Sequence, residues 1–214
     1  MKCMKRHVAL KKQESGNCQI VGKRKMDFKV YEKICELFLK EEGEEFLFAR
    51  CFLTLEWNLM ARSESIVTAN LFHITWEDDS LVFCFAKSKT DQTGRNLNQV
   101  WHVYATPDKP ATCPVLALAT YLFANPGLTD MCGDDDMMDD GVCENVGSSR
   151  LFPGGDQYGQ FMACLHRVIE NNLEEFLLLG IKLGDLGSHS ARKGALSFAS
   201  ASSTMSPPMV IICL

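Results

Sequence analysis

The segment EEFLFARCFLTLEWNLMAR, residues 44–62, constrains the fold more than any other part of this sequence. Its pattern is helical, but apolar residues occupy most of its faces instead of a single stripe. A helix of this kind cannot lie on a surface, because much of its apolar area would remain in water. We therefore expect a buried helix that other elements of the domain cover.

Two further helical patterns flank this segment. Residues 27–40 form an amphipathic helix with Asp27 as its N-cap. Residues 63–76 begin a short helix, with Ser63 as its cap, and become extended near Ile74. The apolar face predicted for the first of these helices consists of Phe28, Tyr31, Ile34, Cys35, Phe38 and Leu39.

The middle of the chain has the pattern of a small sheet. Residues 80–86 are rich in β-formers, residues 87–96 form a polar reversal, and residues 97–105 alternate apolar and polar positions. Pro114 then suits the first turn of a helix, and two more helical patterns follow a loop at about 126–150. The predicted fold class is mostly α with a small antiparallel β-sheet (α+β).

Charge is distributed unevenly along the chain. The formal net charge is −5, yet residues 1–33 hold ten of the 22 lysines and arginines. We expect residues 1–26 to be a basic, flexible arm and residues 27–214 to be one domain, with an acidic loop at about 126–150. A basic arm on an acidic body is compatible with nucleic-acid contact, and equally with a solvated tail.

The cysteines and the N-terminus predict an intracellular protein. Ten cysteines are scattered singly, and the basic N-terminus lacks the apolar core of a signal peptide, so we expect reduced thiols. A zinc site from Cys132, Cys143, Cys164 and His166 is conceivable, but no CxxC pair supports it. We therefore expect no metal and no small-molecule cofactor. The sequence also lacks an apolar run of the ~20 residues that a membrane span requires.

Four residues each have an ordinary structural explanation when they are considered singly. Together, however, they form a pattern. Arg62 follows the apolar helix, Lys89 lies in KSKT, and His189 and Arg192 lie in HSARKGAL. With LEWNLMARS and ITWEDDSL, these segments resemble the tyrosine recombinase (phage integrase) family, and are most similar to eukaryotic Crypton-type members. The resemblance spans roughly residues 27–213 and implies the catalytic-domain fold of that family.

The resemblance also implies a role for each residue. In the family, a tyrosine attacks a DNA phosphodiester, and two arginines hold the nonbridging oxygens as negative charge develops. Arg62 and Arg192 would form this pair, and His189 would assist at the same phosphate. Lys89 would protonate the leaving 5′-oxygen, with Lys87 as the alternative, because one sequence does not fix the hairpin register.

The tyrosines do not match the family pattern. The family's nucleophile follows its last catalytic box, whereas Tyr31, Tyr104, Tyr121 and Tyr158 all precede His189. We therefore expect a catalytic domain that is incomplete before its nucleophile and inactive alone. Phosphate contacts from Lys87, Arg95, Lys193 and the basic arm would dominate binding to double-stranded DNA.

Three functions remain open from the sequence. The first is DNA recombination or integration by a nuclear, self-associating domain of mobile-element origin. The second is a non-catalytic DNA-binding remnant or domesticated protein that keeps the phosphate clamp. The third is a protein-interaction module whose acidic loop contacts a basic partner.

Overall fold

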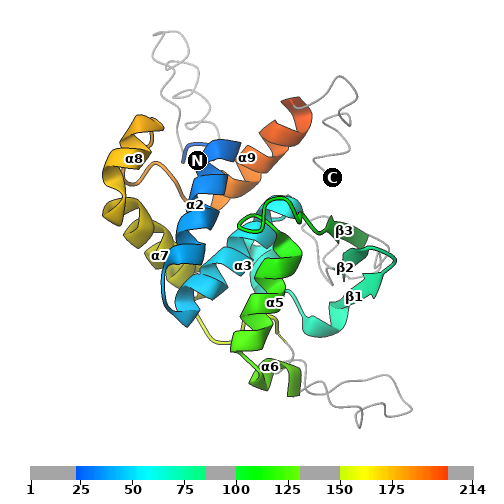
Figure 1. Cartoon of the computed structure of the whole chain (residues 1–214). Coiled ribbons are helices and arrows are strands. Elements are labelled where there is room, and N and C mark those ends of the chain that lie inside the picture. The colour runs from blue at the N-terminus through cyan, green and yellow to red at the C-terminus, as the bar shows by residue number, and fades with distance from the viewer. Residues whose placement is uncertain (1–22, 85–99, 131–149, 202–214) are drawn as a thin grey trace, which may run out of the picture.

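A single helix, α3 (Glu44–Asn58), runs through the middle of the molecule (Figure 1). The computed structural model describes residues 23–84, 100–130 and 150–201. Four helices pack directly on α3: α2 (Phe28–Lys40), α5 (Pro114–Ala124), α7 (Gln157–Asn171) and α9 (Ser188–Ala201). The buried helix predicted from residues 44–62 is confirmed, and its apolar faces are what the four neighbours cover.

Aromatic rings on α3 join the surrounding helices into one core. The Phe52 ring lies 4.9 Å from that of Phe161 on α7, and Trp57 stacks on Tyr31 of α2 at 4.2 Å between centroids. Phe152, which precedes α7, contacts Phe52 at 5.7 Å. Such rings bury large apolar areas and dominate core energetics, so the position of α3 is fixed from several directions at once.

Arg50 is a charged residue in this core, with only 1% of its area exposed. Its guanidinium donates to the carbonyls of Pro110 (2.6 Å) and Ala111 (3.0 Å) and to Thr120 Oγ1 (3.4 Å). Burial lowers the pKa of this guanidinium from its usual value. The three acceptors belong to α5 and the segment before it, so Arg50 fastens α5 to α3.

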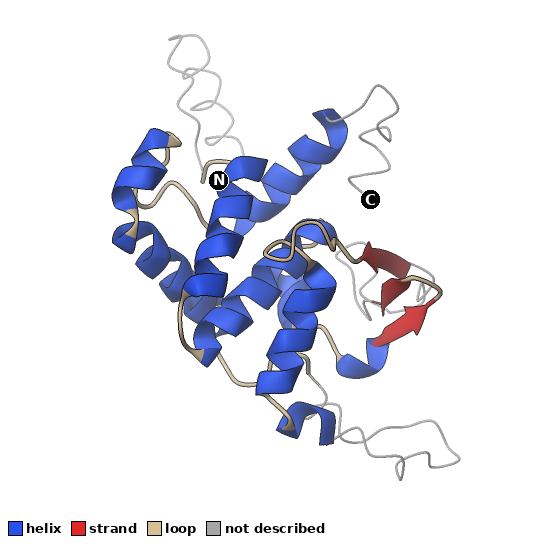
Figure 2. Ribbon diagram, in the orientation of Figure 1, coloured by secondary structure: helices blue, strands red, loops and turns tan. Residues whose placement is uncertain are grey.

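The sheet lies on one side of the helices, away from α8 (Leu173–Leu178) (Figure 2). It is a three-stranded antiparallel meander of β1 (Ile74–Glu77), β2 (Ser80–Cys84) and β3 (Val100–Tyr104). Val103 is buried and Trp101 half-buried, while the alternate positions of β3 are exposed, as the alternation predicted. Together with the helices, this sheet confirms the predicted mostly α class with a small antiparallel β-sheet.

Short elements connect these parts. The chain leaves α3 into α4 (Ser63–Val67) and the 3₁₀ turn η1 (Leu71–His73), which leads into β1. Pro114 occupies the first turn of α5, as predicted, and α6 (Gly127–Asp130) follows it. Asp156 caps α7, since its Oδ1 accepts from the Gly159 N–H at 2.9 Å.

Two expectations about individual positions were wrong, those for Leu39 and Ser63, whereas the N-cap position predicted for Asp27 is confirmed. Leu39 is 45% exposed, whereas Val30 and Leu37 are buried, because the buried face of α2 is turned away from Leu39. Asp27 holds the N-cap position of α2 but makes no side-chain capping bond. Ser63 is the first residue of α4 and not its cap, since its hydroxyl donates into the interior, to Glu56.

The last residues of the expected flexible arm pack against the domain. Met26 is fully buried, and its N–H donates to the Ser190 carbonyl at 2.9 Å. Lys23 and Arg24 donate to carbonyls in the segment before α9, at Gly184 and Gly180. The domain therefore begins before residue 27. Residues 1–22, the hairpin at 87–96 and the acidic run at 131–149 lie outside the described residues.

Candidate functional site

Arg62 stands at the sharp turn that ends α3. The backbone at Met60 has φ 48°, a left-handed conformation that is uncommon for a residue with a side chain. This turn redirects the chain from α3 into α4 and places Arg62 at the N-cap position of α4, half-buried. With other described residues the Arg62 guanidinium makes neither a hydrogen bond nor an ion pair.

His189, Arg192 and Lys193 lie in the first turns of α9. His189 and Lys193 are exposed, whereas Arg192 is half-buried. Helix α9 sits against α3 through Gly194, where an added Cβ would lie 1.8 Å from the Met26 carbonyl oxygen and 2.8 Å from the Trp57 ring. Only glycine permits this approach, so Gly194 sets how closely α9 and Arg192 sit to the end of α3.

Two contacts bring the turn before α4 and the start of α9 together. The Arg192 Nε–H donates to the Met60 carbonyl at 2.9 Å, across 132 positions of sequence. The Ser63 hydroxyl lies 3.5 Å from the Ser188 carbonyl. Because these residues flank Arg62 and His189, the segments that carry the predicted arginine pair and the histidine adjoin one another.

The other predicted residues do not join this cluster in the described part of the chain. Lys87, Lys89 and Arg95 lie outside the described residues. The Lys193 ammonium donates to the Lys23 carbonyl at 2.9 Å on the exposed side of α9, so it helps to hold the N-terminal segment. A second role in DNA contact stays a prediction for Lys193.

The cluster contains a buried carboxyl group that the sequence analysis missed. Glu56 on α3 is fully buried, and its Oε1 accepts the Ser63 hydroxyl hydrogen at 2.8 Å. Desolvation raises the pKa of Glu56 to about 8, and the hydrogen bond from Ser63 and the charge of Arg192 oppose this rise only in part. A charged residue inside a helix that is apolar on most faces was the available signal.

The four tyrosines differ in burial and in hydrogen-bond partners. Tyr31 and Tyr121 are buried, and desolvation raises the pKa of both phenols above the usual value. The Tyr158 hydroxyl lies 3.1 Å from Ser188 Oγ, so Tyr158 contacts the residue that precedes His189. Tyr104 is exposed on β3. Ser188 is the first residue of α9, and its hydroxyl donates to that of Tyr158.

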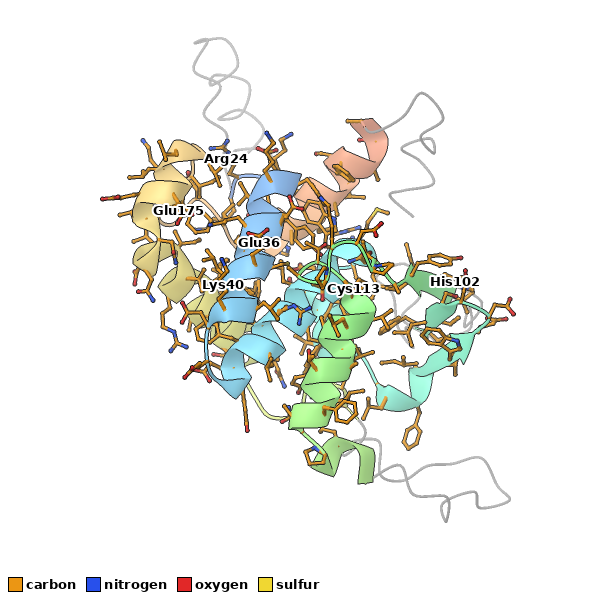
Figure 3. All side chains as sticks on the ribbon, in the orientation of Figure 1. Arg24, Glu36, Lys40, His102, Cys113 and Glu175 are labelled. Atoms are coloured by element: carbon orange, nitrogen blue, oxygen red, sulfur yellow. The ribbon has the colours of Figure 1, made fainter. Side chains whose placement is uncertain are left out.

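The described residues hold neither a metal-binding cluster nor a helix that could cross a bilayer. In residues 23–84, 100–130 and 150–201, no three His, Cys, Asp or Glu side chains gather closely enough to hold a metal ion. Within the same ranges, no helix has both the length and the apolar composition needed to span a bilayer. His102 lies on the sheet (Figure 3). Its Nδ1 lies 2.9 Å from Ser80 Oγ of the neighbouring strand.

Comparison with known proteins gives one informative result. No protein-family profile matches the sequence, and no curated protein matches it. Among solved structures, the fold is similar to that of XerH site-specific recombinase bound to difH substrate in a pre-cleavage complex. The TM-score is 0.51 at 13% sequence identity, over 88% of this chain.

This similarity confirms the predicted fold, which is that of a tyrosine recombinase catalytic domain: mostly helical with a small three-stranded antiparallel sheet. The chain spans 45% of the length of that recombinase.

The clustered segments have the chemistry of an anion site. Guanidinium groups bind phosphate oxygens in a planar, directional way that an ammonium group does not match. Arg62 lies at the start of α4 and Arg192 at the start of α9, with exposed His189 beside Arg192. Glu64 in the first turn of α4 is an exposed acidic residue near Arg62, while the carboxyl group of Glu56 is buried.

Proposed function

We propose that the chain is a DNA-binding domain of the tyrosine recombinase type, in which Arg62 and Arg192 hold one phosphate of the DNA backbone for strand breakage and rejoining. One observation carries the proposal. The Arg192 Nε–H bonds to the Met60 carbonyl, two residues before Arg62, so that residues distant in sequence adjoin within this fold.

The proposed chemistry assigns a task to each group. The two guanidinium groups stabilise the negative charge that develops on the nonbridging oxygens as a tyrosine oxygen bonds to phosphorus. His189 donates a hydrogen bond to the same phosphate. Lys89, or Lys87 as the alternative, gives a proton to the 5′-oxygen as its bond to phosphorus breaks. Arg95 and Lys193 add contacts to neighbouring phosphates.

A second candidate function is DNA binding without cleavage, and the tyrosines favour it. Tyr31 and Tyr121 are buried with raised pKa values, which makes both phenols poor nucleophiles for a DNA phosphate. Tyr158 shares a hydrogen bond with Ser188. A domain of this kind would bind duplex DNA through the same arginines without cutting it.

The wider biological setting is part of the proposal. We infer a nuclear protein of Crypton-type mobile-element origin that self-associates on DNA, either in recombination and integration or as a domesticated DNA-binding remnant. The resemblance of LEWNLMARS and HSARKGAL to Crypton-type recombinases supports this inference.

Binding is tested with a fluorescein-labelled duplex and a series of salt concentrations. We expect affinity to fall steeply with salt, and we expect Arg62→Ala to weaken binding and reduce the slope of log K against log salt by about one. Arg167→Ala, which removes an exposed arginine from α7, is the matched control. Equal binding by the wild type, Arg62→Ala and Arg192→Ala would contradict the site.

Cleavage is tested with a duplex that carries a nick next to the cleavage site, so that the short strand diffuses away. A covalent protein–DNA adduct that survives denaturation would establish strand breakage by this chain. Replacing each tyrosine by phenylalanine would identify the nucleophile. Salt-sensitive binding with no adduct would support the non-catalytic candidate instead.

A further inference from the structure

We propose that Glu56 is a positioning residue for the paired arginines, and this inference rests on the DNA-binding function proposed above. Glu56 acts on Arg62 through the hydroxyl of Ser63. When its carboxyl is ionised, its charge acts on Arg192. Neither interaction requires Glu56 to touch DNA, since its side chain lies wholly in the interior.

The first link runs through Ser63. The 2.8 Å hydrogen bond from the Ser63 hydroxyl to Glu56 Oε1 joins the end of α3 to the first residue of α4. Ser63 is itself 3% exposed, so no solvent replaces this bond when it is broken. Because Arg62 directly precedes Ser63, the bond fixes the backbone from which the Arg62 side chain extends.

The second link runs to α9. Among the described residues, the groups that act on the Glu56 carboxyl are Ser63 from α4 and the charge of Arg192 from α9. The other oxygen of the carboxyl, Oε2, is buried and has no hydrogen-bond partner there. A buried polar atom without a partner costs stability, which is difficult to explain if Glu56 serves the core alone.

The protonation state of Glu56 then affects the arginines. Burial raises the pKa of Glu56 to about 8, so the carboxyl is mainly neutral at pH 7 and gains its charge as the pH rises further. An anion beside Arg192 lowers the positive potential that attracts a phosphate. DNA affinity should therefore decrease as the pH rises through about 8.

Two variants separate positioning from packing. Glu56→Gln keeps the size of the side chain and an oxygen that accepts from Ser63, but it cannot ionise. Glu56→Ala removes both the charge and the acceptor. Thr54→Val is the matched control, because Thr54 is buried on the same helix and its hydroxyl bonds only to backbone carbonyls of α3.

The first measurement is binding of a fluorescein-labelled duplex at constant ionic strength from about pH 6.5 to about 9. At pH 7 we expect wild-type affinity for Glu56→Gln and a loss of about tenfold for Glu56→Ala. The decrease through about pH 8 should occur in the wild type and in Thr54→Val but not in Glu56→Gln. Identical pH profiles for the wild type and Glu56→Gln would overturn the proposal.

A second measurement needs no DNA. The ¹⁵N resonance of Arg192 Nε should shift with a midpoint at about pH 8 in the wild type and stay constant in Glu56→Gln. If the wild type fails to bind duplex DNA but this shift is present, the proposed function fails while the link between Glu56 and Arg192 stands. If the resonance does not titrate, the link itself is wrong.

Discussion

The Arg192 guanidinium and the Met60 carbonyl form a hydrogen bond of 2.9 Å that ties the first turns of α9 to the turn after α3. Met60 can present this carbonyl because its backbone is in the left-handed region, with φ 48°. The bond fixes the Nε edge of Arg192, and the orientation of the whole planar group follows from it. Arg192 therefore has a structural partner as well as its proposed phosphate.

Replacing Arg192 by lysine should weaken DNA binding although the charge is kept. Lysine has no Nε–H at this place and binds phosphate as a point charge, so both the bond to Met60 and the planar contact are lost. We expect affinity to fall about tenfold or more in fluorescence anisotropy at fixed salt. Arg167→Lys on α7 should bind as the wild type does, and equal loss in both variants would contradict the assignment.

Replacing Gly194 by alanine should destabilise the domain. The added Cβ would meet the Met26 carbonyl oxygen at 1.8 Å, and a backbone atom cannot rotate away as a side chain can. We expect the free energy of unfolding in urea to fall by about 3 kcal/mol. Gly127→Ala is the control, because nothing lies within 4 Å of its added Cβ. Comparable stability of the two variants would show that α9 can shift at little cost.

Replacing Arg50 by methionine should also destabilise the domain, for a different reason. Methionine fills much of the space of the buried Arg50 side chain but leaves the partly buried carbonyls of Pro110 and Ala111 without their donor. We expect a loss of about 3 kcal/mol in the free energy of unfolding. Arg167→Met, at an exposed arginine, should leave stability nearly unchanged. A near-neutral result for Arg50→Met would mean that α5 is held by apolar packing alone.

The stability of the protein should depend on pH through Glu56. Its pKa is about 8 in the folded state against an ordinary 4.5, so the folded state binds the more protons between these values. The free energy of unfolding should therefore fall as pH rises through this window, while Glu56→Gln lacks this contribution. Urea unfolding of both proteins at about pH 5 and about pH 8.5 measures this effect. The free energy of unfolding of Glu56→Gln minus that of the wild type should increase by a few kcal/mol between these two pH values. A constant difference would contradict the raised pKa.

The helices and the sheet followed from local patterns in the sequence. The segment 44–62 is apolar on most faces, and its residues 44–58 form the central helix. The alternation at 97–105 predicts that Val103 faces the interior, and Val103 is buried. Such periodicities report which face of an element is apolar, and burial of that face stabilises the element wherever it packs. Arg62, His189 and Arg192 were found through a resemblance of short segments, and the structure places those segments side by side.

Packing between distant segments decided the rest. Glu56 stands in a segment that is apolar on most faces, but its burial depends on α4 and α9 closing over the end of α3. Leu39 fits the apolar face of α2 by periodicity, yet 45% of its area stays exposed among the described residues. Gly194 acquires its role only because Met26 and Trp57 lie against it. The sequence determines which face of each element is apolar. The burial of a group, its close contacts and its pKa depend on the atoms that surround it. Those atoms come from other elements, so only the tertiary structure decides these properties.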